Sequence, residues 1–209
     1  MVHRSTDEGQ SWTIVSPDLT RDDESKQDWS GGPITRDHTG PETYGTIFAF
    51  EESPLVPGLL WAGSDDGLVH VSRDGGDQWE NVTPAEMPES GTVNAVDPSP
   101  HDPARALLAV HRYREDDFTP YVFRTDDYGK SWWLLTVGKN GIPARHFVRV
   151  VREDPVRKGL LYAGTEFGIY VSFDDGTSWE SLQLNLPVTQ VSDLAVKDGD
   201  LVVATHGRS

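Results

Sequence analysis

The sequence predicts an all-β fold built from repeated units of four antiparallel strands. An eight-residue pattern, Ser/Thr-x-Asp-x-Gly-x-x-Trp, occurs four times in the 209 residues. Each copy separates short apolar or alternating runs, which is typical of a β-hairpin. No stretch has the periodicity of an amphipathic helix. The four copies are Ser5–Trp12, Ser72–Trp79, Thr125–Trp132 and Ser172–Trp179.

Each fixed position of the pattern has a structural role in such a hairpin. The glycine can adopt a positive φ, which a tight return requires. The aspartate can accept hydrogen bonds from N–H groups of its own loop, with help from the Ser or Thr hydroxyl. The tryptophan then re-enters the sheet, and we expect it to bury a large apolar surface. The residues predicted to be structural are therefore Asp7, Trp12, Asp74, Trp79, Asp127, Trp132, Asp174 and Trp179.

The copies divide the chain into units of about the length that four short strands need. The phrases Leu59–Gly63 and Leu160–Gly164 are nearly identical and set the register between units. Too few residues precede the first copy to form the earlier strands of a full unit. Too few residues follow the last copy to form a further complete unit. The sequence thus predicts one domain with half-units 1–15 and 191–209, a long loop 16–43, and complete units 44–83, 92–137 and 146–184.

The eight-residue pattern resembles the Asp-box, or bacterial neuraminidase repeat. This repeat occurs in β-propellers: sialidases, xyloglucanase-type glycosidases, sortilin-type receptor domains and photosystem assembly factors. The resemblance implies four-stranded blades, with the box between the third and fourth strands and away from the active site. Sialidase activity is not expected, because the nearest phrase to that family's Arg-Ile-Pro motif, Gly141-Ile142-Pro143, lacks the arginine.

Longer stretches resemble an internal segment of large bacterial glycosyl hydrolase or sortilin-like repeat proteins. That resemblance implies a fragment of a larger protein and an extracytoplasmic location, although Met1–Thr6 has no signal-peptide core. The stretches are Ser30–Thr35, Trp61–Val69, Val150–Gly159 and Ala204–Ser209.

The two half-blades allow two ways of completing the propeller. Residues 1–15 supply a third and a fourth strand, and residues 191–209 supply a first and a second. In one alternative Val2–Arg4 pairs with Asp200–Thr205 in the same chain, so that a fourth blade closes the ring. In the other, the chain is a partial propeller whose open blade edges bind another subunit, as in a homo-oligomer.

Composition narrows the class of partner. The net charge of −16 disfavours nucleic acid and anionic membrane surfaces, and its field favours a cation or a divalent metal. No apolar run approaches the length of a membrane span. Cysteine is absent, so disulfides, thiolate metal sites and thiol nucleophiles are excluded. No cofactor is required by any motif.

The innermost strands of a propeller line its channel, where ligands bind. His146 is expected to open such a strand. By register His206 is expected to match Ser64, Arg112 and Thr165, at the end of a second strand. Imidazoles and carboxylates converging there would hold a divalent metal and activate water for ester or phosphoester hydrolysis. The catalytic candidates are His146, His206, Arg149 and Asp193, and the ligand-binding candidates are Asn94, Trp29 and His38.

Two functions remain open from the sequence. The first is a binding or interaction module for a protein or glycan ligand at the channel face. The alternative is a hydrolase, either glycosidase-like by resemblance or metal-dependent through the histidines and aspartates. With 34 acidic residues, no pair of catalytic carboxylates can be selected from the sequence alone.

Overall fold

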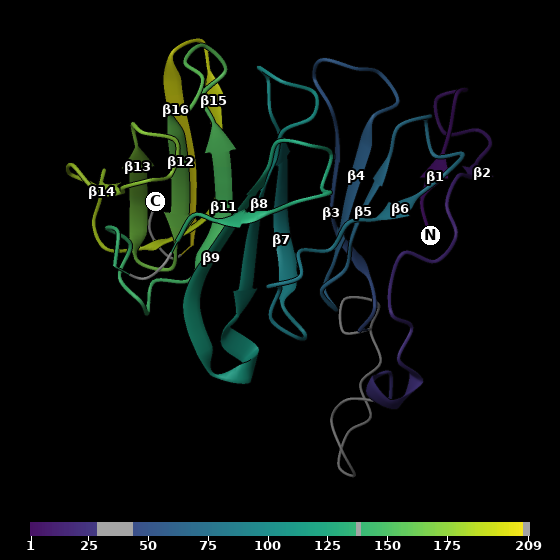
Figure 1. The fold of residues 1–209 in the computed structure, drawn as a ribbon, viewed down its shortest axis with the longest axis horizontal. Helices are drawn as coiled ribbons and strands as arrows, with labels where there is room; N and C mark the ends of the chain where they lie inside the picture. The colour runs from purple at the N-terminus through teal and green to yellow at the C-terminus, as the bar shows by residue number, and fades with distance from the viewer. Residues whose placement is uncertain (29–43, 137–138, 207–209) are drawn as a thin grey trace.

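The computed structural model describes residues 1–28, 44–136 and 139–206, and these form the predicted all-β fold. Antiparallel sheets follow one another in chain order through contacts between β3 and β7, β7 and β11, and β11 and β15, and the N- and C-termini lie on opposite sides of the molecule (Figure 1). Neighbouring sheets touch through their first strands. Each sheet is therefore one blade, and the first strands line the inner edge of the row.

Three of the described sheets have four strands. The first consists of β3 (Ile47–Glu52), β4 (Leu60–Ser64), β5 (Val69–Ser72) and β6 (Glu80–Asn81). The second consists of β7 (Thr92–Pro98), β8 (Ala106–Arg112), β9 (Asp117–Thr125) and β10 (Trp133–Leu134). The third consists of β11 (Val148–Glu153), β12 (Leu161–Thr165), β13 (Gly168–Ser172) and β14 (Glu180–Ser181).

Two-stranded sheets flank this row. At one end lie β1 (His3–Arg4) and β2 (Thr13–Ile14), and at the other lie β15 (Gln190–Lys197) and β16 (Asp200–His206). Two 3₁₀ turns complete the described elements, η1 (Glu24–Lys26) and η3 (Tyr113–Glu115). The described part of the 16–43 stretch packs on a blade, where the Arg21 N–H donates to Asp66 at 2.6 Å.

The core lies between blades rather than within one. One apolar cluster fills the space between the first two complete blades and includes Trp61 and Phe123. A second cluster, with Leu107 and Leu161, joins the second and third blades and extends to β15. The middle strands are covered on both faces by neighbouring sheets, so they need apolar side chains on both faces. Strand β8 shows this, because only its last residue, Arg112, is not buried.

All four hairpins have the same local hydrogen-bond pattern. The aspartate accepts a bond from the backbone N–H four residues later, at 2.8–2.9 Å: Ser11 to Asp7, Gln78 to Asp74, Ser131 to Asp127 and Ser178 to Asp174. The glycine N–H donates to the first Ser or Thr hydroxyl, as Gly129 does to Thr125 at 2.8 Å. Each glycine has a positive φ, for example +84° at Gly129. The carboxylates are thus engaged inside their own turns.

The expected burial of the motif tryptophan is wrong for Trp12. Trp179 is 3% exposed, whereas Trp12 is 62% exposed, although both belong to hairpins with the same local bonds. The difference comes from the neighbouring blade. A motif tryptophan is covered by the blade that precedes it in the chain, and none of the described residues forms a blade against this face of Trp12 (Figure 1).

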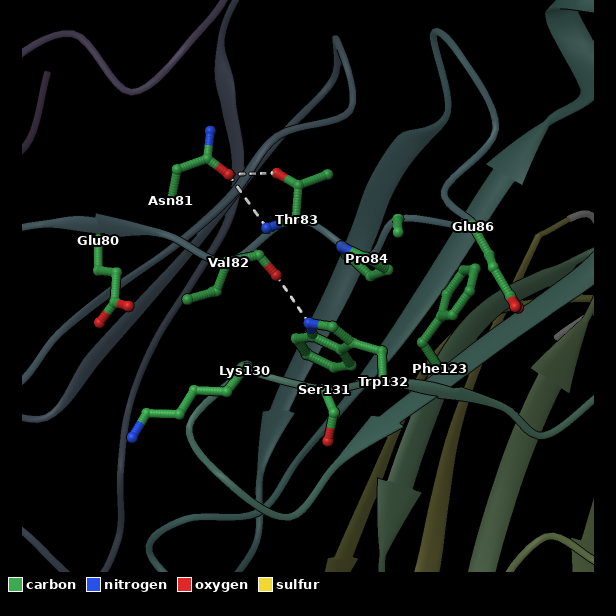
Figure 2. A pocket seen from close by; sticks show the side chains of 12 residues that line it. Glu80, Asn81, Val82, Thr83, Pro84, Glu86, Phe123, Lys130, Ser131 and Trp132 are labelled. Atoms are coloured by element: carbon green, nitrogen blue, oxygen red, sulfur yellow. Dashed lines mark hydrogen bonds between the residues drawn. The ribbon is translucent and has the colours of Figure 1, made fainter.

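A recurring contact, which we call the seam, joins each blade to the next. In Figure 2 the carbonyl of Val82, at the end of one blade, faces the indole of Trp132 in the next, and the two form a 2.7 Å hydrogen bond. A hollow of about 500 Å³ lies beside this bond at the outer rim. The Val82 side chain packs against Gly129, where an added Cβ would lie 2.6 Å from the Val82 Cβ. The motif glycine therefore makes room for the neighbouring blade.

Closure of the ring within one chain is a wrong prediction. In the described part of the chain, β1 pairs only with β2, and β15 pairs only with β16. Three complete blades separate the two half-sheets (Figure 1). Among the described residues, no helix is long and apolar enough to cross a membrane.

Candidate binding site on the inner face

The first strand of each complete blade, and β15 of the C-terminal half-blade, carries a β-bulge at the same place. The register shifts between Ile47 and Ala49, between Val93 and Ala95, between Val148 and Val150, and between Val191 and Asp193. A bulge leaves one residue unpaired and re-aims its side chain, and bulges are frequent beside binding sites. The four bulge residues are Phe48, Asn94, Arg149 and Ser192. All four line one hollow of about 300 Å³ on the inner face, which we call the inner hollow.

Asn94 and Arg149 are fixed by their surroundings at one end of the inner hollow. The Asn94 amide donates to the Arg149 carbonyl at 2.5 Å, and its oxygen accepts from the His111 Nε2 at 3.0 Å. The Arg149 guanidinium donates to Glu166 at 2.9 Å. It also lies over the rings of Phe147 and Tyr113, at 4.9 and 5.3 Å from their centres. Both side chains therefore present polar groups in a set orientation.

His111 is the neutral member of this group. Burial, together with the charges of Arg149 and Arg114, lowers the pKa of His111 to about 4. At neutral pH the ring is uncharged and has one N–H. Because the Asn94 amide nitrogen is already a donor, the Asn94 oxygen is the acceptor, and the proton of His111 is assigned to Nε2.

Acidic side chains and one arginine form the other end. Arg152 lies 3.0 Å from Asp193 and 3.6 Å from Asp97, and its Nε donates to the Leu194 carbonyl at 3.0 Å. The pKa of Asp97 is raised to about 7, mainly by burial and also by the charges of Glu153 and Glu51, against the opposing effect of Arg152. At neutral pH the Asp97 carboxyl is thus partly protonated, which is unusual for a carboxyl.

The inner hollow continues into a second one, of about 390 Å³, through Glu51, Arg152 and Asp193. Two aromatic rings stand exposed along the inner hollow, with Phe48 53% and Phe50 41% exposed. The site combines apolar rings with a few directed polar groups, which is the usual composition of a small-molecule or carbohydrate site.

Of the predicted site residues, the structure brings Asn94, Arg149 and Asp193 together in the inner hollow. His146 lies elsewhere: it precedes β11, packs on Phe167 with 4.5 Å between ring centres, and lies 2.9 Å from the Tyr170 hydroxyl. Trp29 and His38 lie outside the described residues.

His206 is exposed at the end of β16, where its Nδ1 lies 3.0 Å from the Gln190 amide. Its predicted register is wrong by one position. The pairs Gln190–His206 and Thr92–His111, and the backbone bonds from Asp65 and Glu166 to the neighbouring strands, show that His206 matches Asp65, His111 and Glu166.

The described residues contain no group of three or more His, Asp or Glu side chains placed to hold a metal ion. The expected divalent-metal site therefore has no counterpart in the part of the chain that the structure describes. His146 and His206, the two imidazoles proposed for it, do not share a cavity among the hollows described above.

Sequence reasoning missed the bulges, Phe48, Asp97 and Arg152. One signal was present: a polar residue interrupts an apolar run in Val93-Asn94-Ala95 and again in Val148-Arg149-Val150. A residue that breaks the alternation in a first strand marks a side chain re-aimed towards the inner face. For Asp97 and Arg152 the sequence carries no comparable signal.

Comparison with known proteins shows which proteins have a similar sequence and architecture. No family model matches the chain. A xyloglucanase from a Paenibacillus species is 27% identical over 184 residues, which is 78% of this chain and 18% of that protein. The solved GH74 xyloglucanase from Xanthomonas campestris superposes with a TM-score of 0.65 at 20% identity, over 97% of this chain and 30% of that one.

Two further solved structures have the same fold. An ancestral GH74 enzyme gives a TM-score of 0.67 at 18% identity, over 97% of this chain and 24% of that one. The structure of YCF48 bound to D1 peptide gives a TM-score of 0.58 at 20% identity, over 77% of this chain and 48% of that one. The fold is that of a β-propeller. The chain spans less than half the length of each of these relatives.

Proposed function

We propose that this chain is a glycan-binding β-propeller module and that the inner hollow holds a segment of a polysaccharide. The observation that carries the proposal is the convergence of the four bulge residues on one hollow, with exposed rings beside directed polar groups. An aromatic face packs against the C–H face of a sugar ring, and amide and guanidinium groups bond its hydroxyls.

The rigidity of the polar groups supports this function. Asn94 and Arg149 are each held by a partner, His111 and Glu166 respectively, so little side-chain entropy remains to be lost on binding. A neutral glycan also tolerates the acidic surface, whose net charge of −16 would repel an anionic ligand. The similarity to xyloglucanases makes xyloglucan the first ligand to test.

We further propose that the four hairpin motifs are Asp-boxes with a purely structural role. Their carboxylates already accept bonds within the turn, as Asp127 does from the N–H and the hydroxyl of Ser131 at 2.9 and 2.6 Å. A carboxylate that is engaged in this way locks the hairpin and has few lone pairs left for a ligand.

Calorimetric titration with xyloglucan oligosaccharides tests the binding function. We expect Phe48→Ala and Asn94→Ala each to weaken binding by about tenfold, the effect of roughly 1.4 kcal/mol. Phe173→Ala is the matched control, because Phe173 is equally exposed, at 53%, but lies in a hairpin away from the inner face. Binding of peptides but not of glycans, or binding that Phe48→Ala leaves unchanged, would overturn the proposal.

A glycoside hydrolase is the second candidate, and the pKa of Asp97 favours it. Hydrolysis of a glycosidic bond needs one carboxylic acid and one ionised carboxylate. Asp97, with a pKa of about 7, supplies the first, and Asp193, across Arg152 from it, supplies the second.

Release of reducing sugar from xyloglucan distinguishes the two candidates. Hydrolysis that is lost in both Asp97→Asn and Asp193→Asn, while binding persists, would identify an enzyme. If the unmodified chain binds xyloglucan but releases no sugar, the hydrolase candidate is excluded and the binding module remains. A chelator should change neither result, since the proposed residues act without a metal.

A further inference from the structure

The hollow of about 500 Å³ in Figure 2, which we call the rim hollow, lies between the first two complete blades. Its walls include Val82, Gly129, Lys130 and Trp132. Each of these positions is defined by its distance from a motif tryptophan, so the boundary between the second and third blades has the same four. They are Leu135, Gly176, Thr177 and Trp179. The two boundaries can therefore be compared residue by residue.

Between the second and third blades this space is filled by the chain itself. The main-chain N–H of Trp179 donates to the Asn140 carbonyl at 2.7 Å. The Asn140 side-chain amide donates to the Leu135 carbonyl at 2.7 Å. It also lies 3.4 and 3.3 Å from the carbonyl oxygens of Gly176 and Thr177. Asn140 thus contacts all four positions that correspond to the walls of the rim hollow.

The residue after Asn140 has to be a glycine. Gly141 has a φ of +122°, and an added Cβ would overlap the Trp179 carbonyl oxygen. Ile142 follows and is 1% exposed, in the same apolar cluster as Trp179. Trp179 is accordingly buried, whereas Trp132 beside the rim hollow is partly exposed. An Asn-Gly segment therefore covers the motif tryptophan with its main chain.

The linker beside the rim hollow is two residues shorter. Thr83 and Thr136 follow the fourth strands at equivalent positions, and their hydroxyls accept bonds from third-strand N–H groups at 2.9 and 3.0 Å. Each linker then reaches an apolar residue and a proline, Met87-Pro88 or Ile142-Pro143. Three residues separate Thr83 from Met87, and five separate Thr136 from Ile142. The shorter linker leaves the space beside Trp132 open.

The groups that bind Asn140 have unpaired counterparts at the rim hollow. The main-chain N–H of Trp132 has no acceptor among the described residues, since the ladder between β9 and β10 begins at Trp133. The carbonyls of Gly129 and Lys130 likewise receive no hydrogen bond from the described part of the chain. The rim hollow therefore offers one donor and two acceptors in the arrangement that holds Asn140.

The charge of the rim hollow favours a basic ligand. Glu80 and Glu86 are both exposed and stand at opposite ends of the hollow (Figure 2). Lys130 is one cationic side chain against these two carboxylates. The net charge of the whole chain, −16, adds to the attraction for a cation.

We propose that the rim hollow binds an extended segment of a partner polypeptide in which Asn-Gly is flanked by basic residues. The partner's asparagine carbonyl accepts from the Trp132 N–H, and its side-chain amide donates to the Gly129 and Lys130 carbonyls. Its glycine passes the Trp132 carbonyl, and its basic side chains meet Glu80 and Glu86. A peptide is the fitting occupant, because the chain holds a peptide segment of its own at the equivalent place. The fourth strands form this site, so it is separate from the inner hollow.

Nuclear magnetic resonance of the isotope-labelled chain tests the site with two peptides. The probe is acetyl-Lys-Ser-Asn-Gly-Lys-amide, and its match has alanine in place of the glycine. We expect the probe to shift the main-chain N–H signal of Trp132 in a saturable way. The alanine peptide should bind at least about tenfold more weakly, because its methyl group meets the Trp132 carbonyl. Equal binding of the two peptides, or signals that shift only at the inner hollow, would overturn the proposal.

A charge reversal tests the orientation of the basic side chains. Glu86→Lys should weaken binding of the probe by about two- to fivefold, the effect of an exposed ion pair. Glu89→Lys is the matched control, because Glu89 is exposed in the same linker but does not line the rim hollow. The control should bind as the parent chain does. The same loss in both variants would show a general effect of charge and would contradict this site.

A longer linker should close the rim hollow from within. Residues 84–86 are replaced by the five residues of positions 137–141, Val-Gly-Lys-Asn-Gly, which gives both linkers the same length. The variant should lose binding of the probe, and hydrogen exchange of the Trp132 N–H should slow, because that group gains an acceptor. A folded variant that binds the probe as the parent does would overturn the proposal. If the variant does not fold, the comparison of Glu86→Lys with Glu89→Lys decides.

Discussion

The indole N–H of Trp132 donates to the main-chain carbonyl of Val82 at 2.7 Å, across the boundary between two blades and 50 residues along the chain. The local hairpin bonds hold a blade's own turn, but this bond holds one blade to another. The motif therefore has two roles, one inside its hairpin and one at the seam, and the two can be separated by substitution.

Gly129→Ala should destabilise the chain more than Gly9→Ala does. Both glycines have nearly the same φ, +84° and +86°, so both variants carry a similar left-handed strain. Only at Gly129 does the new methyl group meet Val82, at 2.6 Å. We expect an additional cost of about 1–3 kcal/mol, measured by urea unfolding. Equal losses in the two variants would show that the seam tolerates a side chain.

Arg105→Met should be strongly destabilising. Arg105 is 3% exposed and lies 3.2 Å from the buried carboxylate of Glu153, with Asp126 and Asp175 also in contact. Its removal leaves buried negative charge without compensation, at a cost of about 3–5 kcal/mol. Arg73→Met is the control, because its pair with Glu80 is solvent-exposed and contributes at most about 1 kcal/mol. The midpoints of urea unfolding of the two variants, each compared with the parent chain, test this expected difference.

Asp97→Asn should make the free energy of unfolding depend less on pH between about pH 4 and pH 7. The folded pKa of Asp97, about 7, lies above the unfolded value of about 4. The folded chain therefore binds more protons in this window, and its stability falls as the pH rises through it. The variant lacks this titration and should lose less stability between pH 5 and pH 8. Parallel profiles for variant and parent would contradict the assignment.

Asp174→Asn should change the pH dependence of the free energy of unfolding in the opposite direction, and at lower pH. The Ser178 hydroxyl, followed by the Ser178 N–H, lowers the pKa of Asp174. The contribution of such a carboxylate is present above its unfolded pKa of about 4 and is lost as the pH falls below it. The variant should be less stable at pH 6, with a smaller decline towards pH 3. Asp77→Asn, at an exposed position of another hairpin, should keep the parent's decline.

The amino-acid sequence by itself determined the hairpins and the number of blades. Asp127 and Ser131 are four residues apart, so one short phrase contains the whole hydrogen-bond pattern, and its repetition counts the blades. The prediction of Asn94, Arg149 and Asp193 as inner-strand residues rested on the same count, and the structure brings these three together.

Only the tertiary structure determined which residues contact one another across the boundary between two blades. Trp12 and Trp179 belong to the same motif, yet one is exposed and the other buried, because burial depends on the preceding blade. Arg152 contacts Asp97 and Asp193, and these three residues lie on three different strands. Such contacts join residues some 40 to 55 positions apart, so no local stretch of the sequence contains them. The structure also keeps the strands of the two half-blades unpaired with each other, where the sequence permitted a closed ring.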